Sequence, residues 1–173
     1  LEKELCDKAK DKMKSTLNQE KHIVNRINKG EESNTIKKFL DLSHDGLLKM
    51  QDYHRNPVDN SITFDNQKTC LIVYNGTGYP DLICIFLEDA EKIEKKGSRS
   101  YTEYSNYIAN NVERFKHKMF EVEAEFNLTS FADHDTSEKK VLQSKYIFCE
   151  NSSTDFYESK FNVKIPVISI KDF

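Results

Sequence analysis

Residues 69–88 of the chain have the sequence TCLIVYNGTGYPDLICIFLE, and this stretch decides the fold. Two apolar runs flank a segment that contains Gly and Pro, which predicts an antiparallel hairpin with a turn at 76–80. Cys70 and Cys84 are equidistant from Thr77 at the centre of that hairpin. Because the turn fixes the register, we expect the two cysteines to face each other with β-carbons about 4.5–5.5 Å apart. This spacing suits a disulfide between the two strands.

The cysteine count extends this hypothesis to the whole chain. Four cysteines are present, and a Cys70–Cys84 bridge leaves Cys6 and Cys149 to form a second one. Two disulfides would place the protein in an oxidising compartment, so we expect it to be secreted or extracellular. The alternative is four buried thiols in a cytosolic protein. The spacing of Cys and His residues does not match a zinc site.

Three sequons support the extracellular interpretation. Asn75-Gly-Thr, Asn127-Leu-Thr and Asn151-Ser-Ser each match the N-glycosylation pattern. Asn75 opens the hairpin turn, Asn151 lies in another predicted turn, and Asn127 points away from an apolar strand face. Glycans at these three positions would leave the core undisturbed.

Length and charge limit the class of protein. A chain of 173 residues fits one domain, residues 1–173, and is long enough to bury a sizeable core. The net charge of -3 is spread over both signs, so we expect no nucleic acid partner. The longest apolar run, residues 82–87, is far shorter than the roughly 20 residues that span a bilayer.

The first third of the chain has helical periodicity. Apolar residues recur at helical spacing over about 1–28, and Gly30 provides a stop. A second helix is predicted from about Asn34 to His54, ahead of Pro57. Residues 1–56 therefore form the expected helical part.

The remaining residues, 61–173, predict mainly an antiparallel sheet. Ser61–Phe64 and the hairpin come first, and Asp89–Lys96 forms a possible helical turn. A helix follows near 101–114, opened by the capping pair Ser100 and Glu103. Three long antiparallel strands are expected at about 119–130, 141–150 and 156–170. In the first of these, apolar residues alternate strictly with polar ones, which predicts one dry and one solvated face.

This order of elements predicts an α+β fold in which the N-terminal helices pack on one face of a curved antiparallel sheet. The topology is similar to the cone-shaped cystatin-like and nuclear-transport-factor-like folds, although no motif is shared with either. A lipocalin-like β-barrel is the alternative. The helical first third of the chain counts against it.

No arrangement typical of catalysis, of a metal or of a cofactor stands out in the sequence. Serine and cysteine nucleophile motifs and phosphate-binding loops are missing, and the chain has only five glycines. Asp133-His134-Asp135 has side chains that could hold a divalent ion, but a polar turn between two strands is the simpler explanation. Glu121, Glu123 and Glu125 form an acidic stripe that either docks a basic partner or is a plain solvated face.

Tyrosines supply the candidate contact surface. Tyr101, Tyr104 and Tyr107 share a helix, and Tyr74 and Tyr79 flank the hairpin turn. A hairpin held by a disulfide would present Tyr79, with Tyr74 and Pro80 beside it, to a partner. These three residues are the predicted partner-binding residues.

The sequence favours a secreted, disulfide-bonded, N-glycosylated binding protein that presents a rigid surface to a protein partner and has no catalytic activity. One alternative is a carrier of a small hydrophobic ligand, lined by Phe120, Val122, Phe126 and Tyr104, which requires an internal cavity. A further alternative is an enzyme on a cone-shaped fold, which requires a carboxylate or histidine of raised pKa inside such a cavity.

Overall fold

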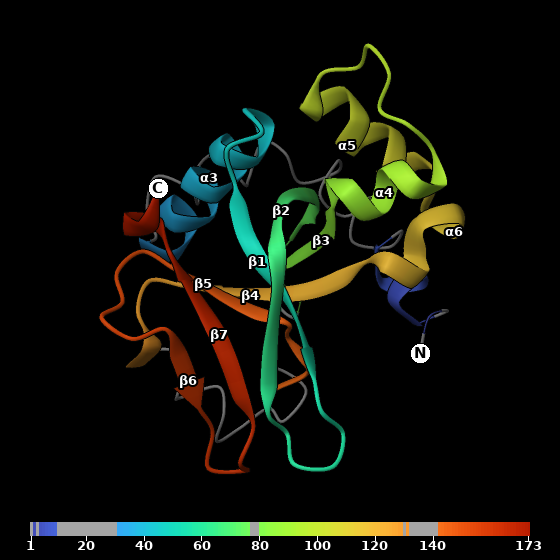
Figure 1. The fold of residues 1–173 in the computed structure, drawn as a ribbon. Helices are drawn as coiled ribbons and strands as arrows, with labels where there is room; N and C mark the ends of the chain where they lie inside the picture. Colours follow the sequence, from blue (N-terminus) through green and yellow to red (C-terminus); the bar gives the residue numbers. More distant parts are fainter. Residues whose placement is uncertain (1, 3, 10–30, 77–79, 130, 132–141) are drawn as a thin grey trace.

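The structure is a computed structural model that describes residues 2, 4–9, 31–76, 80–129, 131 and 142–173 (Figure 1). Residues 2 and 4–9 are helical, as the periodicity predicts, and the rest of the expected helix at 1–28 lies outside the described residues. The elements that follow are α3 (Glu31–His44), β1 (Lys49–Arg55), β2 (Ile62–Asn75), β3 (Leu82–Phe86), α4 (Leu87–Ile93), α5 (Tyr101–Asn110), α6 (Val112–Phe115), η1 (Lys116–Lys118), β4 (Phe120–Glu125), β5 (Tyr146–Cys149), β6 (Phe156–Glu158), β7 (Lys164–Ser169) and η3 (Ile170–Asp172).

The described strands form one curled sheet of mixed direction, so the mixed α+β class is confirmed. The strand order is β1-β2-β3-β4-β5-β7-β6. Neighbours from β1 to β4 pair antiparallel, whereas β4, β5 and β7 run parallel to one another. The expectation of three antiparallel strands in the last third is therefore wrong. Parallel neighbours need a long connection, and residues 126–145 and 150–163 supply two of them.

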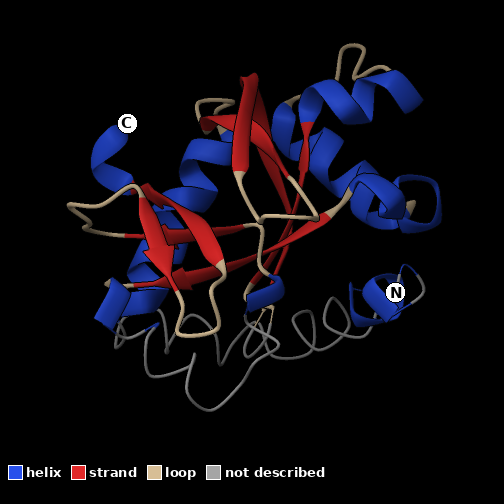
Figure 2. Cartoon of the chain, turned by 60° about the horizontal axis from the view of Figure 1, so that its bottom comes forward, coloured by secondary structure: helices blue, strands red, loops and turns tan. Residues whose placement is uncertain are grey.

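Both faces of the sheet are covered, in contrast to the one-sided sheet that the sequence predicts. One face packs against α4, α5, α6 and the N-terminal helix, through Leu71, Ile83 and Ile85. The opposite face packs against α3 through Ile72 and Phe86 (Figure 2). The N-terminal helix and α3 therefore lie on opposite faces and not on one.

The hairpin of β2 and β3 exists, but its register differs from the expected one. Cys70 pairs with Phe86 and Cys84 pairs with Ile72, because the pairing next to the turn, Asn75 with Leu82, is not centred on Thr77. The two cysteines are therefore diagonal neighbours, and they are not directly opposite each other. Both lie in the core between the sheet and α3, with their thiols hydrogen-bonded to each other.

The second predicted helix, 34–54, is wrong in its second half. Helix α3 ends at His44, and Gly46 follows with a φ of 70°, a left-handed conformation that suits glycine at a helix end. Residues 49–55 then form β1, which pairs with β2. The expected helical part at 1–56 therefore contains a strand.

Three other predicted elements end earlier than expected or are divided in two. The strand expected at 119–130 ends at Glu125, and Asn127 lies in a bend. The strand expected at 156–170 is a hairpin of β6 and β7, turned near Asn162, which has a φ of 61°. The helix expected at 101–114 is α5 and α6, separated at Asn111; its predicted cap is confirmed, since Ser100 accepts a hydrogen bond from the backbone N–H of Glu103.

In the part of the chain that the structure describes, every helix is too short or too polar to cross a membrane.

Candidate functional site

Two acidic residues from neighbouring strands meet in the interior. Asp81 immediately precedes β3 and Glu123 lies on β4; their side chains belong to residues that are only 6% and 4% exposed. The Asp81 carboxylate accepts a hydrogen bond from the backbone N–H of Ala124 at 3.0 Å. The Glu123 carboxylate accepts one from the backbone N–H of Asp81 at 3.3 Å. Each carboxylate is thus oriented by the backbone of the other strand.

Two more glutamates complete what we call the carboxylate cluster: Glu32, Asp81, Glu123 and Glu125. Glu125 is the last residue of β4 and is 1% exposed. Glu32 lies in the first turn of α3, where its side chain is hydrogen-bonded to Glu125 and interacts with the charge of Asp81. The four side chains therefore come from one helix and two strands.

The electrostatics of the carboxylate cluster favour bound protons. Burial, the largest cause, raises the pKa of Glu123 from 4.5 to about 10 together with the charges of Asp81 and Glu125 and the hydrogen bond with Asp81. Burial and the charge of Asp81 raise the pKa of Glu32 from 4.5 to about 7. A hydrogen bond between two carboxyl groups requires a proton, so Asp81 with Glu123 and Glu32 with Glu125 form two proton-sharing pairs.

The carboxylate cluster lies at the edge where parallel strands end. Glu125 pairs with Cys149, so the carboxyl ends of β4 and β5 meet there. Helix α3 lies next to this edge, since Thr35 donates a hydrogen bond of 2.9 Å to Glu150, which follows β5 (Figure 1). In open sheets with parallel strands, ligands bind outside the carboxyl ends of the strands.

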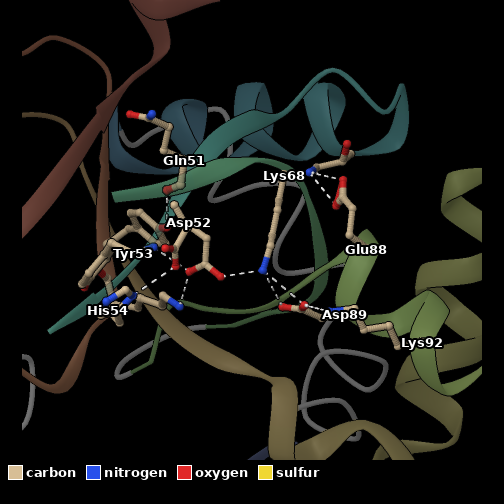
Figure 3. A network of polar contacts seen from close by, with 12 residues as sticks. Gln51, Asp52, Tyr53, His54, Lys68, Glu88, Asp89 and Lys92 are labelled. Atoms are coloured by element: carbon tan, nitrogen blue, oxygen red, sulfur yellow. Dashed lines mark hydrogen bonds and ion pairs between the residues drawn. The ribbon is translucent and has the colours of Figure 1, made fainter. Parts of the chain in front are cut away.

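A second group of charges, the lysine–aspartate network, consists of Asp52, Lys68, Asp89 and Lys145 (Figure 3). Asp52 on β1 pairs with Lys68 on β2 at 2.8 Å and with Lys145 at 2.7 Å. Lys68 also pairs with Asp89 of α4 at 3.2 Å. Every member of this network has a partner of opposite charge.

The lysine–aspartate network closes the curled sheet. Lys145 precedes β5, and its ammonium group lies 5.2–5.5 Å from the ring centroids of Tyr53, Phe86 and Phe120. Burial raises the pKa of Asp52, but hydrogen bonds from Lys145 and Lys68 outweigh this and hold it below its usual value. These paired and satisfied charges are typical of a structural contact that joins β1 to β5.

Two of the three predicted partner-binding residues, Tyr74 and Pro80, are buried. Tyr74 lies in the core under α5. Tyr79 lies outside the described residues, as do Asp133, His134 and Asp135. The acidic stripe is only partly solvated, because Glu123 and Glu125 are buried.

The predicted ligand-lining residues are separated by the sheet. Phe120 and Val122 pack with the core on the α3 face, whereas Tyr104 packs with the core on the opposite face. Phe126 follows the end of β4. The two hollows that we find along the described chain are grooves of about 520 and 410 Å³ with several charged residues in their walls.

The four cysteines and the sequons have clear positions. All four cysteines are buried free thiols in the structure; Cys6 and Cys149 belong to different core clusters. Asn151 is exposed, and Asn75 and Asn127 are partly exposed. Secretion and glycosylation stay predictions.

Among the described residues, no three His, Cys, Asp or Glu side chains are arranged to hold a metal ion. Comparison of the chain with protein-family models, with curated proteins and with solved structures found no match.

Sequence reasoning missed the carboxylate cluster. The signal for it was an acidic residue directly before the apolar run 82–87, together with a Glu-x-Glu pair at the end of a strand. The strict alternation along 120–129 indicated solvated glutamates, because the pattern carries no information about what covers that face.

Proposed function

We propose that this protein is an enzyme, a hydrolase of phosphate esters that depends on a divalent cation, with the carboxylate cluster as its centre. The observation that carries the proposal is Glu123, which is 4% exposed and has its pKa raised to about 10 beside Asp81. The enzyme alternative requires a carboxylate of raised pKa inside a pocket; Glu123 supplies the raised pKa, whereas the two grooves described above are lined by other residues.

Stability gives no reason to bury Asp81, Glu123 and Glu125. An ionised carboxylate in the interior costs several kcal/mol unless it is paired, and apolar residues of similar volume serve a core better. Buried groups with strongly perturbed pKa values are concentrated at functional sites. The position at the carboxyl ends of β4 and β5 agrees with this interpretation.

A divalent cation is the ligand that the donor set favours. The carboxylate cluster offers only oxygen atoms, which suit Mg²⁺ or Mn²⁺. A bound cation would replace the protons that now reduce the repulsion between the carboxylates. Mg²⁺ is commonly held by one or two carboxylates together with substrate phosphates, so a cage of three protein ligands is not required. Such an ion, when bound, would supply Lewis-acid chemistry by polarising a phosphoryl oxygen and lowering the pKa of a bound water.

The residues divide the remaining tasks. Asp81 and Glu123 are oriented by the backbone N–H groups of Ala124 and Asp81, which suits them to hold a cation in a fixed position. Glu32, with a pKa of about 7, is suited to accept a proton from an attacking water near neutral pH. Glu125 holds Glu32 in place through their shared hydrogen bond.

The two other hypotheses remain predictions with less support. A secreted binding protein needs an exposed contact surface, and Tyr74 and Pro80 are buried. A carrier needs an enclosed cavity, and Phe120 and Tyr104 belong to separate packed cores.

The proposal is tested with bis(4-nitrophenyl) phosphate as substrate, with Mn²⁺, with Mg²⁺ and with a chelator. We expect hydrolysis that requires the cation and that falls by more than about 100-fold in Asp81→Asn and in Glu123→Gln. Glu121→Gln is the matched control, because Glu121 lies on the same strand outside the carboxylate cluster. Hydrolysis that persists in both cluster variants at the wild-type rate would contradict the proposal.

A further inference from the structure

We infer that Glu150 is a positioning residue that holds the first half of α3 over the carboxyl ends of β4 and β5 and thereby keeps Glu32 at the carboxylate cluster. The functional importance of this contact rests on the proposed function. The contact itself is independent of it and has its own measurement.

Glu150 contacts α3 at two residues, Thr35 and Lys38. Thr35 donates a hydrogen bond of 2.9 Å to one carboxylate oxygen of Glu150, and Lys38 forms a short ion pair with the other. Thr35 is fully buried, so its hydrogen bond is shielded from water. A carboxylate bonded at both oxygens by a hydroxyl and an ammonium group is a strong, directional anchor.

The contacts with Glu150 and the carboxylate cluster share one face of the helix. Glu32, Thr35 and Lys38 follow one another at intervals of three residues, which places them in a row along α3. Glu150 directly follows Cys149, which pairs with Glu125. The strand end that anchors α3 is therefore adjacent to the strand end that Glu32 contacts.

The aromatic contacts of α3 lie C-terminal to Thr35. Phe39 stacks on Phe148 with ring centroids 4.4 Å apart and packs edge-on against Phe173. These rings hold the middle of α3. The row from Glu32 to Lys38 is held by the contacts of Thr35 and Lys38 with Glu150, together with the hydrogen bond between Glu32 and Glu125.

Burial raises the pKa of Glu150, but the hydrogen bonds from Lys38 and Thr35 outweigh this effect and hold it below its usual value. Glu150 is thus ionised at neutral pH, unlike the proton-sharing glutamates beside it. Its role is to anchor α3, and the role of Glu32 is chemical.

The test compares Glu150→Gln with wild type and with the control Glu94→Gln. Glu94 pairs with Arg114 on the helices between β3 and β4, away from α3. Two quantities are measured: amide hydrogen exchange of residues 31–40 without cation, and Mn²⁺ affinity by electron paramagnetic resonance. We expect Glu150→Gln to speed exchange at 35–38, whose amides bond within the described helix, by about tenfold and to weaken Mn²⁺ binding by about tenfold, with Glu94→Gln at wild-type values in both.

The charge-reversed pair Lys38→Glu with Glu150→Lys serves as a rescue variant, because it restores the ion pair with opposite polarity. We expect it to recover most of both losses. If Glu150→Gln does not fold, the same two quantities are measured in Thr35→Val with Lys38→Met. Wild-type exchange and Mn²⁺ affinity in these variants would overturn the inference.

The failure of the proposed function gives a different result. If the wild type does not bind Mn²⁺, the cation-dependent activity is wrong, and hydrogen exchange at 35–38 then decides alone whether Glu150 holds α3. Faster exchange in Glu150→Gln supports the anchor, and unchanged exchange refutes it.

Discussion

Asp52 and Lys145 form an ion pair of 2.7 Å although β2, β3 and β4 separate their strands in the sheet. The contact is possible because the sheet curls until β1 approaches the start of β5. Tyr146 adds a second link by donating a hydrogen bond of 2.7 Å to the backbone oxygen of Gln51. The lysine–aspartate network is therefore the closure of the curled sheet.

Replacing Asp52 should expose this role. Asp52→Asn leaves Lys68 and Lys145 without their shared partner in a mostly buried place, so we expect a loss of about 2–4 kcal/mol in the free energy of unfolding. Urea denaturation measures it. Asp65→Asn is the control, because the Asp65–His54 pair is 44% and 66% exposed. That variant should lose about 0.5 kcal/mol or less, and an equal loss in both would refute the closure.

The carboxylate cluster should make the protein less stable as pH rises. The folded state keeps a proton on Glu123 up to a pKa of about 10, whereas the unfolded state releases it near 4.5. Between these values the folded state binds more protons, so the free energy of unfolding falls by up to about 1.4 kcal/mol per pH unit. Glu32 contributes in the same direction between 4.5 and about 7.

Denaturation in chelator across this pH range measures the slope, and Glu123→Gln should flatten it above neutral pH. Asp52 acts in the opposite direction. Its lowered pKa gives stability that is present above its ordinary value of 3.8 and is lost as pH falls through its lower folded value. Stability that rises steadily from pH 5 to pH 9 in the wild type would refute the raised pKa of Glu123.

Two glycines with similar backbone angles should respond differently to alanine. Gly46 has a φ of 70° and a Cβ there would collide with the Tyr101 ring, while Gly97 has a φ of 65° and open space around it. We expect Gly46→Ala to cost about 3 kcal/mol or more and Gly97→Ala about 1 kcal/mol, since only the first adds a collision to the backbone strain. Equal costs from thermal denaturation would contradict the packing of α3 against α5.

The thiols give a direct test of the disulfide prediction. The four cysteines of the structure are buried and form no disulfide, so the native protein should not react with Ellman's reagent. After unfolding without reductant, about four thiols per chain should react. Two disulfides would give no reaction in either state. That outcome would support the secreted location that the sequence favours.

The sequence predicted local structure well wherever a residue acts on its neighbours in the chain. Ser100 caps α5 through Glu103, and the apolar runs around 76–80 form the β2–β3 hairpin. Both features depend on contacts within a few residues. For this reason the mixed α+β class was also predictable.

The features that the sequence did not predict depend on distant contacts. The strands pair from Asn75 with Leu82 and not about Thr77, which leaves Cys84 out of line with Cys70, and the apolar runs themselves carry no sign of it. The glutamates on β4 alternate as solvated residues do, yet Glu123 and Glu125 are buried. Whether a strand face is covered is decided by elements far away in the chain.

Glu32 shows the same limit for the site. It lies 49 residues before Asp81 in the chain and reaches the carboxylate cluster only because α3 docks at the ends of β4 and β5. Nothing in the residues around Glu32 marks it as different from the other helical glutamates.

The most direct test of the carboxylate cluster is a calorimetric titration of Mn²⁺ into the wild type, Asp81→Asn and the control Glu121→Gln, in two buffers of different ionisation enthalpy. The account predicts that the wild type and Glu121→Gln bind Mn²⁺ and release protons, because the cation replaces the protons shared by the carboxylates. Asp81→Asn should bind at least about tenfold more weakly. Absence of binding in the wild type, or equal affinity in Asp81→Asn, would contradict the account.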